Sequence, residues 1–430
     1  MPRTHLNELS SLVGKTVEVV GFVQVIRDQG SIKFLRLRDR YGSVQVVILK
    51  NHASVFELVD KLTTESVVKI TGLVKEANQV AEKIEIEADS IEILSLSAPE
   101  LPIPVSAQKG GGESDIALRL DWRWLDLRLP EKQQLFSVWT QLEEGFRSYL
   151  LKNDFLQLYT PSIMNAPSES GAEVFEVKYF DGLAYLAQSP QFFKQMAMAS
   201  GLERVFMTGP VFRAELSFTT RHMTEFTGWD FEFSYIDSHH DVMDMEEGAL
   251  IAGLSNVKTH VLPDLVIPKT PFPRIVFSEA KAMLKKAGIE SEKPFDFSPL
   301  EERELGKIVE KEHKSEFFFV IDYPIEGRAF YHMRHADNPK LTKGFDLFYK
   351  GLEVTTGAQR EHRIDVLETQ AKEKGLTLAS IADYLNFFRF GCPPHGGVGI
   401  GPGRIVAQIL NLPSVKEATF LPRDVKRIRP

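Results

Sequence analysis

The segment VFRAELSFTTRHMTEF, residues 211–226, carries more charged side chains than a core strand or a surface turn needs. Its pattern predicts a strand, a polar loop and a second strand that continues into TGWDFEF. Alternation would place Arg213 and Glu215 on one face of the first strand, and Phe226 and Asp230 on one face of the second. Arginine can bind a phosphate, glutamate the exocyclic amine of a base, and phenylalanine can stack on its ring. The segment therefore indicates a nucleotide site, although a surface hairpin with ordinary ion pairs fits the spacing equally well.

The segment HGGVGIGPGRIVAQIL, residues 395–410, is a glycine-dense passage from a strand into a helix, with Arg404 at the start of the helix. Glycines let a ligand approach the backbone closely, and an arginine at this place can reach an anion. The passage loosely matches the GxGxxG pattern of dinucleotide-binding folds, but Pro402 interrupts it and no βαβ unit follows. We reject the dinucleotide interpretation, and a glycine turn that merely packs tightly remains an alternative to an anion site.

The composition is that of a globular protein with more than one domain. Of 430 residues, 43% are hydrophobic and 26% are charged, so the chain can bury large cores and is long for a single domain. No apolar run approaches membrane-spanning length and no secretory signal pattern is visible, so we expect a soluble, cytoplasmic protein without a membrane segment. The only cysteine, Cys392, excludes an intramolecular disulfide. The formal net charge of -8 leaves the choice of partner open, because a local basic face can still bind phosphates.

Short alternating segments rich in valine and isoleucine fill most of residues 16–94. Five such segments with one short helical interruption predict a small Greek-key barrel of the OB type. The stretch that follows is rich in proline, glycine and serine and shows no apolar period, which is typical of a linker. We therefore expect a five-stranded OB-fold domain over residues 1–96, a linker or hinge over 97–125, and a larger domain over 126–430.

The larger domain mixes helices and strands irregularly. Residues 133–154 have apolar side chains at three-to-four-residue spacing, which predicts a long helix packed on a sheet. Strands are expected within 204–215, 229–236, 316–324, 329–333 and 344–357, and helices within 241–254, 274–288 and 363–375. The fold class is therefore α+β, with a large antiparallel sheet flanked by helices.

Two groups of histidines have structural interpretations. His239 and His240 follow a probable cap at Asp237 or Ser238, and we expect both rings to face water. His332 and His335 have no third ligand at a suitable spacing, so zinc is not expected there.

Taken together, residues 211–226 and 395–410 resemble motifs 2 and 3 of the class II (subclass b) aminoacyl-tRNA synthetases, in their proper order. The long helix followed by FLQLYTPSIM resembles motif 1, with Pro161 at its usual place at the dimer interface. The resemblance extends over essentially the whole chain and is strongest to the archaeal-type aspartyl enzymes, through AQSPQFFKQ, GLEVTTGAQREH and the terminal LPRD. It implies an ATP-dependent, AMP-forming ligase that charges tRNA and acts as a homodimer.

The resemblance also implies roles for residues around ATP. It assigns Arg213 to the α-phosphate, His222 and Arg404 to the γ-phosphate, Phe226 to stacking on adenine and Glu215 to its amine, with Arg213 and Arg404 as the catalytic residues. The remaining ATP-site positions are Arg221 and Glu353. Asp346, Glu353 and Thr356 match the magnesium-holding positions, and their oxygen atoms are the kind of ligand that Mg²⁺ prefers. One departure is Gly403, where the family usually carries an acidic residue, and it puts the positioning of Arg404 in question.

The amino acid implied by the resemblance is L-aspartate. Lys194 and Arg360 match the residues that contact the side-chain carboxylate, and those near the α-amino end match Glu169, Ser189, Gln191 and Asp230. A carboxylate between two cations makes charge-assisted hydrogen bonds, whereas asparagine would leave two desolvated cations without an anion. We therefore favour aspartate over the asparagine counterpart. An exposed helical lysine is the alternative interpretation of Lys194, and a paralogue without catalytic activity is the alternative for the whole chain.

The predicted barrel matches the anticodon-binding domain of the family. Arg27, Phe34 and Gln45 match its anticodon positions, with Phe34 as the stacking ring and Gln45 as the reader of a base edge. Phe34 could instead belong to the barrel core. Gln24 departs from the residues typical of enzymes restricted to tRNA(Asp) and of those that also charge tRNA(Asn), so the tRNA range stays open.

Overall fold

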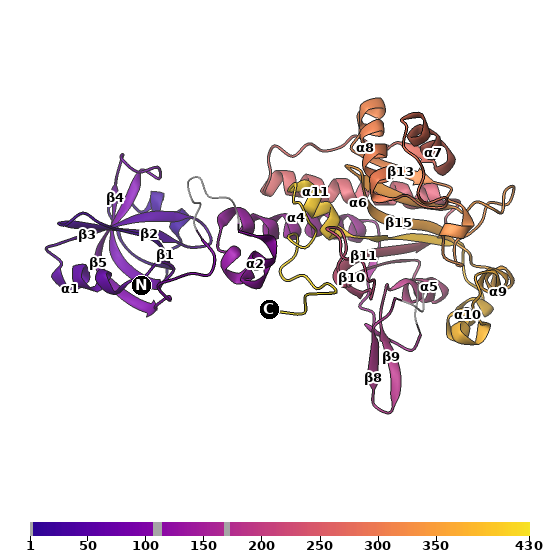
Figure 1. Cartoon of the computed structure of the whole chain (residues 1–430), viewed down its shortest axis with the longest axis horizontal. Helices are drawn as coiled ribbons and strands as arrows, with labels where there is room; N and C mark the ends of the chain where they lie inside the picture. The colour runs from indigo at the N-terminus through magenta and orange to yellow at the C-terminus, as the bar shows by residue number, and fades with distance from the viewer. Residues whose placement is uncertain (1–2, 106–113, 167–172) are drawn as a thin grey trace. The chain divides into compact units, whose positions relative to one another are not determined.

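The computed structural model describes residues 3–105, 114–166 and 173–430, and these form two compact units, residues 1–133 and 134–429 (Figure 1). Each unit has its own hydrophobic cores. Among the helices of the described segments, none combines the length and the apolar composition needed to cross a lipid bilayer.

The first unit contains the predicted barrel, so the OB-fold expectation is confirmed. Its strands close in the order β1-β2-β3-β5-β4. Alternate residues of each strand fill the interior, as the period-two pattern requires. The elements are η1 (Leu6–Ser11), β1 (Thr16–Asp28), β2 (Ile32–Arg38), β3 (Ser43–Leu49), α1 (Ala53–Leu58), η2 (Val59–Lys61), β4 (Val67–Glu76) and β5 (Ile84–Ser95).

Part of the stretch predicted as a linker forms helices. Helix α2 (Ile116–Asp121) lies within it, and α3 (Arg123–Asp126) begins in it and ends one residue beyond it. Asp115 caps α2 by accepting a hydrogen bond from the backbone of Ala117. The described residues of this stretch belong to the first unit. The composition signal came from its proline- and glycine-rich first half and missed the apolar spacing of the second.

The second unit is built on an eight-stranded sheet, in agreement with the α+β expectation. Only its outer pairings, β12 with β13 and β10 with β6, are parallel. In sheet order the strands are β12 (Arg274–Val276), β13 (Phe317–Ile321), β14 (Gly344–Tyr349), β15 (Leu352–Arg360), β16 (His395–Ile400), β11 (Glu225–Ser234), β10 (Arg204–Phe212) and β6 (Leu156–Gln157).

Two long helices, α4 (Pro130–Lys152) and α6 (His239–His260), run along the sheet (Figure 1). The predicted apolar stripe of α4 enters the main core together with β11 and β16. Gly145 of α4 lies against Ala252 and Gly253 of α6, where a Cβ would come within 2.5 Å of the Ala252 carbonyl oxygen. This close approach of two helices requires glycine.

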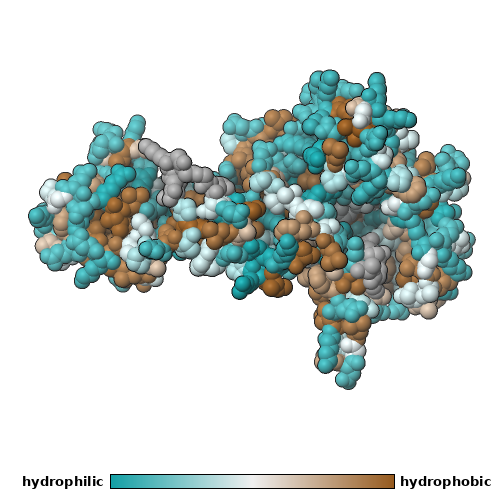
Figure 2. Space-filling view, viewed as in Figure 1, coloured by the Kyte–Doolittle hydropathy of each residue, from teal (hydrophilic) through white to brown (hydrophobic). Residues whose placement is uncertain are grey.

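The remaining helices and a small sheet surround the large sheet. The helices are α5 (Gln191–Ala199), α7 (Phe277–Lys286), α8 (Pro299–His313), η3 (Ile325–Gly327), α9 (Ile364–Glu373), η4 (Leu378–Ile381), α10 (Ala382–Arg389) and α11 (Pro402–Ile409). The small sheet has β7 (Ile163–Met164), β8 (Glu176–Tyr179) and β9 (Gly182–Leu186). The β8–β9 hairpin projects from the second unit (Figure 1) and exposes apolar side chains (Figure 2). Of these, Phe180 is 80% exposed.

Several local predictions were wrong. Strand β10 ends at Phe212, so Arg213 and Glu215 lie in a loop beyond it rather than on a strand face. Residues 274–276 form a strand before α7 begins, and residues 329–333 form only an isolated bridge between His332 and Arg360.

The water-facing prediction for His239 was wrong as well. Ser238 caps α6 as predicted, but the ring of His239 is buried, 3.3 Å from a carboxylate oxygen of Asp322.

Candidate active site

A cavity of about 360 Å³ opens on one face of the large sheet, and most of the predicted site residues line it. Its walls come from α5, β11, β15, α11 and the loop between β10 and β11. The predicted residues that line it are Ser189, Gln191, Lys194, Arg213, Glu215, Arg221, His222, Phe226, Asp230, Glu353, Thr356, Arg360 and Arg404. Asp346 is not among the lining residues. Glu169 lies outside the described residues.

The period of β11 decides which of its residues reach the cavity. Phe226, Gly228 and Asp230 alternate along the strand and line the cavity. Trp229 and Phe231 point to the other side and belong to the fully buried core under α4. The sequence prediction for the face of this strand is therefore confirmed.

Lys194 and Arg360 meet at one end of the cavity. The Lys194 Nζ donates to the carbonyl oxygen of Val398 at 2.8 Å and lies 3.5 Å from Asp230 and 3.4 Å from Glu232. The Arg360 Nε donates to the other oxygen of Glu232 at 3.1 Å. Lys194 is only 1% exposed, so the alternative of an exposed helical lysine is excluded.

Glu232 is the counter-ion that the two cations share. Burial alone would raise the pKa of Glu232, but Arg360 and Lys194 outweigh it and lower the pKa. For Asp230 burial dominates and raises the pKa, although Lys194 opposes the shift. Glu232 therefore stays ionised and gives both cationic side chains a negatively charged partner in a desolvated place.

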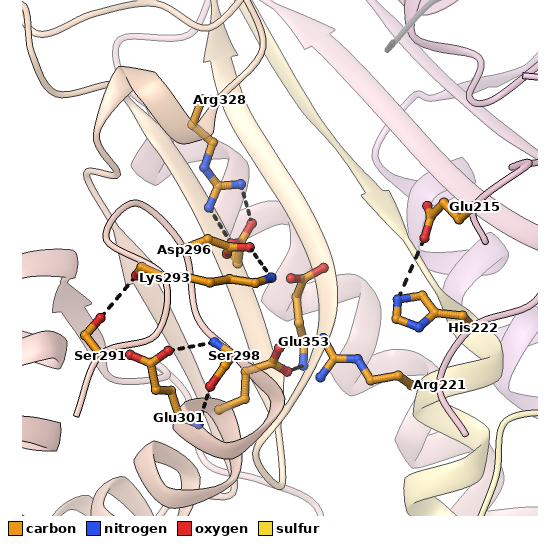
Figure 3. Close-up of polar contacts among 12 residues, drawn as sticks. Glu215, Arg221, His222, Ser291, Lys293, Asp296, Ser298, Glu301, Arg328 and Glu353 are labelled. Carbon is orange, nitrogen blue, oxygen red and sulfur yellow. Dashed lines mark hydrogen bonds and ion pairs between the residues drawn. The ribbon is translucent and has the colours of Figure 1, made fainter. Parts of the chain in front are cut away.

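The second half of the cavity carries the groups expected around a nucleotide. The Arg213 guanidinium lies 5.6 Å from the centroid of the Phe226 ring, and its side chain is 42% exposed. Glu215 lies 3.8 Å from His222 (Figure 3) and at the same distance from Arg213. Burial lowers the pKa of His222, and the nearby Arg404 guanidinium lowers it further. Open guanidinium and aromatic faces beside a carboxylate form a surface that suits a base and its phosphates.

Arg404 is positioned by Glu353 rather than by its own neighbour. Its Nη1 donates to the backbone oxygen of Glu353 at 2.7 Å and lies 3.4 Å from the carboxylate. At Gly403 an added Cβ would make only ordinary contact, 3.7 Å from Trp139. In this structure Arg404 therefore has two contacts, both with Glu353, that do not involve residue 403.

The oxygen atoms available to a metal are unequal. Glu353 and Thr356 line the cavity. Asp346 instead accepts two hydrogen bonds from Arg328, one of them at 2.9 Å, while the Arg328 guanidinium lies 3.6 Å from the Tyr323 ring centroid. Burial raises the pKa of Asp346 to about 6, and it raises that of Glu353 as well.

Among the described residues, no three or more His, Cys, Asp or Glu side chains form a group that could hold a metal ion. The oxygen atoms of Glu353 and Thr356 suit a hard cation that is also bound by a ligand's phosphates. Asp346 fits such a site only if its hydrogen bonds with Arg328 break.

Three residues of this region were missed by the sequence analysis. Glu232 stands two positions after Asp230, so alternation along β11 could have found it. Arg328 precedes a stretch that was predicted as a strand. Glu302, on α8, binds Arg221 and has no sequence signal, because helix positions far from the motifs come to the site only through tertiary packing.

In the first unit, the predicted anticodon residues share a surface. Arg27 pairs with Phe34 across β1 and β2, and Phe34 alternates with the inward-facing Leu35, which argues against the core alternative. Gln45 lies on β3, and its Nε2 donates to Glu85 at 2.9 Å. Gln24 falls at the register shift between Val23 and Val25, so it sits at a β-bulge.

Comparison with protein families gives two matches. Residues 115–425 match the family described as tRNA synthetases class II (D, K and N), and residues 17–94 match the OB-fold nucleic acid binding domain.

Individual proteins resemble the chain over its whole length. The aspartate–tRNA(Asp) ligase of Pyrococcus furiosus is 38% identical, with 100% of both chains covered. The aspartate–tRNA(Asp/Asn) ligase of Aeropyrum pernix is 41% identical, covering 98% of this chain and 97% of that protein. The crystal structure of asparaginyl-tRNA synthetase from Pyrococcus horikoshii complexed with asparaginyl-adenylate is 31% identical, with a TM-score of 0.92 and 100% of both chains covered.

Proposed function

The chain belongs to the class II tRNA synthetases of the aspartate, lysine and asparagine group, and we propose that it is an aspartate–tRNA ligase. It activates L-aspartate with ATP and transfers it to the 3′ end of tRNA(Asp). The observation that carries the choice of amino acid is the buried pair Lys194 and Arg360 around Glu232. An asparaginyl enzyme is the second candidate, because a synthetase of that type shares the fold over the whole chain.

In the first step the α-carboxylate of aspartate attacks the α-phosphorus of ATP. A carboxylate–phosphorus bond forms, the bond to the β-phosphate breaks, and pyrophosphate leaves. The nucleophile is already ionised at neutral pH, so the step needs alignment and charge stabilisation rather than a general base. We assign Arg213 to the α-phosphate, Arg404, His222 and Arg221 to the outer phosphates, Phe226 to adenine stacking and Glu215 to the adenine amine.

The amino acid is held by the opposite end of the cavity. Lys194 and Arg360 bind its side-chain carboxylate, and Asp230, Ser189 and Gln191 surround its ammonium group. Glu169 belongs to the same proposed set. Asparagine offers no anion to the two cations, so its binding leaves their charge uncompensated.

Magnesium is the proposed metal, and when bound it neutralises phosphate charge. Glu353 and Thr356 would hold it, and Asp346 would join them after parting from Arg328.

The second step transfers the aspartyl group to the terminal adenosine of tRNA, and AMP leaves. The barrel supports tRNA recognition, with Phe34 stacking on an anticodon base, Gln45 reading a base edge, and Arg27 and Gln24 at its border. Whether tRNA(Asn) is also a substrate depends on this surface, since relatives of both kinds resemble the chain.

We propose a cytoplasmic homodimer as the working form. The exposed apolar residues Leu156, Tyr159 and Ile163, which lie in the motif 1 region, support a protein interface there.

Aminoacylation of purified tRNA(Asp) and tRNA(Asn) tests the proposal, together with ATP–pyrophosphate exchange driven by each amino acid. We expect aspartate, and not asparagine, to drive exchange and to be attached to tRNA(Asp). A site that excludes by unpaired polar groups can discriminate by about 10⁴. Equal exchange with both amino acids would overturn the assignment of the pocket, and exchange with asparagine alone would establish the second candidate.

A further inference from the structure

Helix α8 lies outside the three sequence motifs, yet it brings one carboxylate to the edge of the proposed ATP site. Glu302, in its first turn, is 2% exposed. One of its oxygens accepts a hydrogen bond from Arg221 Nη2 at 2.5 Å, and the other accepts one from the backbone N–H of Glu353 at 3.1 Å. A single side chain therefore joins the loop after β10 to the start of β15.

A glycine contact allows the helix to come this close. A Cβ on Gly306 would lie 2.6 Å from the Cα of Gly351, which stands in the turn between β14 and β15. Gly351 itself has a φ of +71°, a conformation that suits glycine. Because no side chain separates α8 from this turn, Glu302 can reach the backbone of Glu353, which follows the turn directly.

The contacts of Glu302 organise both ends of the phosphate-binding region. The backbone of Glu353 is held at its N–H by Glu302 and at its carbonyl oxygen by Arg404, so the point from which its side chain extends is fixed. Arg221 is held through Nη2, while its buried Nε has no hydrogen-bond partner among the described residues. A buried donor without a partner is costly, which is consistent with a site that receives an anionic oxygen.

We propose that Glu302 is a positioning residue of the ATP site, which fixes the Arg221 guanidinium and the Glu353 backbone before the nucleotide binds. This inference rests on the proposed function and extends it to a helix that carries none of the recognised motifs. Positioning of this kind lowers the cost of ordering long side chains when the ligand arrives. It acts on ATP and not on aspartate, because Lys194 is held by Val398 of β16 and Arg360 by Glu232 of β11.

The variant Glu302→Gln tests the proposal, since it keeps the size of the side chain and removes its charge. We expect the KM for ATP in pyrophosphate exchange to rise about tenfold, with the KM for aspartate within about twofold of wild type. The dissociation constant of α,β-methylene-ATP, measured by calorimetry, should rise by a similar factor. Glu310→Gln, an exposed glutamate on the same helix, is the matched control and should change neither constant.

A double-mutant cycle separates positioning from a general structural role. If Glu302 acts through Arg221, then Glu302→Gln added to Arg221→Gln raises the KM for ATP much less than it does in the wild type. Independent, multiplying effects of the two substitutions would overturn the proposal. Equal increases in the KM for ATP and for aspartate would overturn it too, because they indicate a structural role.

A second variant tests the proposal independently, in case Glu302→Gln does not fold. Gly306→Ala inserts a methyl group between α8 and the turn, and we expect it also to raise the KM for ATP selectively. A Gly306→Ala protein that melts like wild type and binds α,β-methylene-ATP unchanged would contradict the proposal. Failure of the proposed function itself would appear separately, as wild-type protein that shows no aspartate-dependent exchange.

Discussion

Lys194 occupies an environment that lysine side chains rarely enter, with a carbonyl oxygen and two carboxylates around its ammonium group. Removing one charge from such a group leaves its partners buried and uncompensated, so the arrangement is maintained only if every member keeps a partner. Glu232 meets this condition through Arg360, and Asp230 through Lys194. The pocket is therefore ordered before a substrate enters it.

At the scale of this residue we predict the effect of Lys194→Met. The substitution keeps most of the side-chain length and removes the ammonium group, and Glu232 retains Arg360 as a partner. We expect kcat/KM for aspartate in pyrophosphate exchange to fall by about 100-fold or more, with the KM for ATP within about twofold. The exposed Lys178 supplies a control, Lys178→Met. An unchanged requirement for aspartate would remove Lys194 from the pocket.

Sequence patterns located the cations of the site but missed two of the carboxylates that hold them, Glu232 and Glu302. Lys194, Arg360 and Arg404 stand inside recognisable motifs, and the structure places all of them at the cavity. The partner of Arg221 is Glu302 on α8, 81 positions further along the chain. Pairings over such distances depend on the packing of whole elements, which local patterns do not encode.

Helix α6 carries a buried carboxyl group under the sheet. Glu246 has no exposed surface, and Thr355 on β15 is the side chain that opposes the effect of this burial on its pKa. Burial raises the pKa of Glu246 from 4.5 to about 8, so the folded protein carries this group protonated at neutral pH. Folding above pH 4.5 therefore requires that a proton be taken up.

This feature predicts a pH dependence that belongs to α6. Since the folded-state pKa is raised, the contribution of Glu246 to stability is fully present below pH 4.5 and is lost as the pH rises towards about 8. The loss amounts to roughly 1.4 kcal/mol per pH unit within this window. In Glu246→Gln the loss is absent, so the variant should gain stability over wild type as the pH rises from 5 to 8.

Urea unfolding of both proteins at several pH values measures this gain. The exposed Glu144 on α4 provides the control, Glu144→Gln, which should follow wild type at every pH. Parallel curves for wild type and Glu246→Gln would contradict the assignment of a protonated Glu246.

The long elements were easier to predict than their ends. The apolar period of α4 and the alternation of the barrel strands extend over many residues, so tertiary context rarely overrides them. Strand β10 ends three residues before Glu215 because the loop it enters follows the cavity rather than the sheet. The same reason applies to residues 329–333. Their alternation predicted a strand, but in the structure this segment forms part of the cavity wall.

On the scale of the whole molecule, the proposed activities fall in different compact units. The cavity residues proposed to activate aspartate lie in residues 134–429, and the residues proposed to bind the anticodon lie in residues 1–133. Changes in the barrel should therefore alter the use of tRNA without altering the chemistry of adenylate formation.

Phe34→Ala tests this division. Stacking of a base on an aromatic ring contributes about 1–3 kcal/mol, so kcat/KM for tRNA(Asp) should fall roughly 10- to 100-fold. Aspartate-dependent pyrophosphate exchange, measured without tRNA, should stay at the wild-type rate. Full aminoacylation by Phe34→Ala would show that the ring has no part in anticodon binding, and reduced exchange would show that the two units are not independent.

The shared position of Glu232 has a consequence for electroneutrality. Burial raises the pKa of Asp230, so Lys194 and Arg360 have the ionised Glu232 as their main counter-ion and leave a surplus of positive charge at that end of the cavity. A substrate whose side chain carries one negative charge cancels the surplus, whereas an amide leaves it standing in a medium that screens charge poorly. The discrimination proposed for this pocket thus depends on the carboxyl groups of Glu232 and Asp230 as much as on the two cationic side chains.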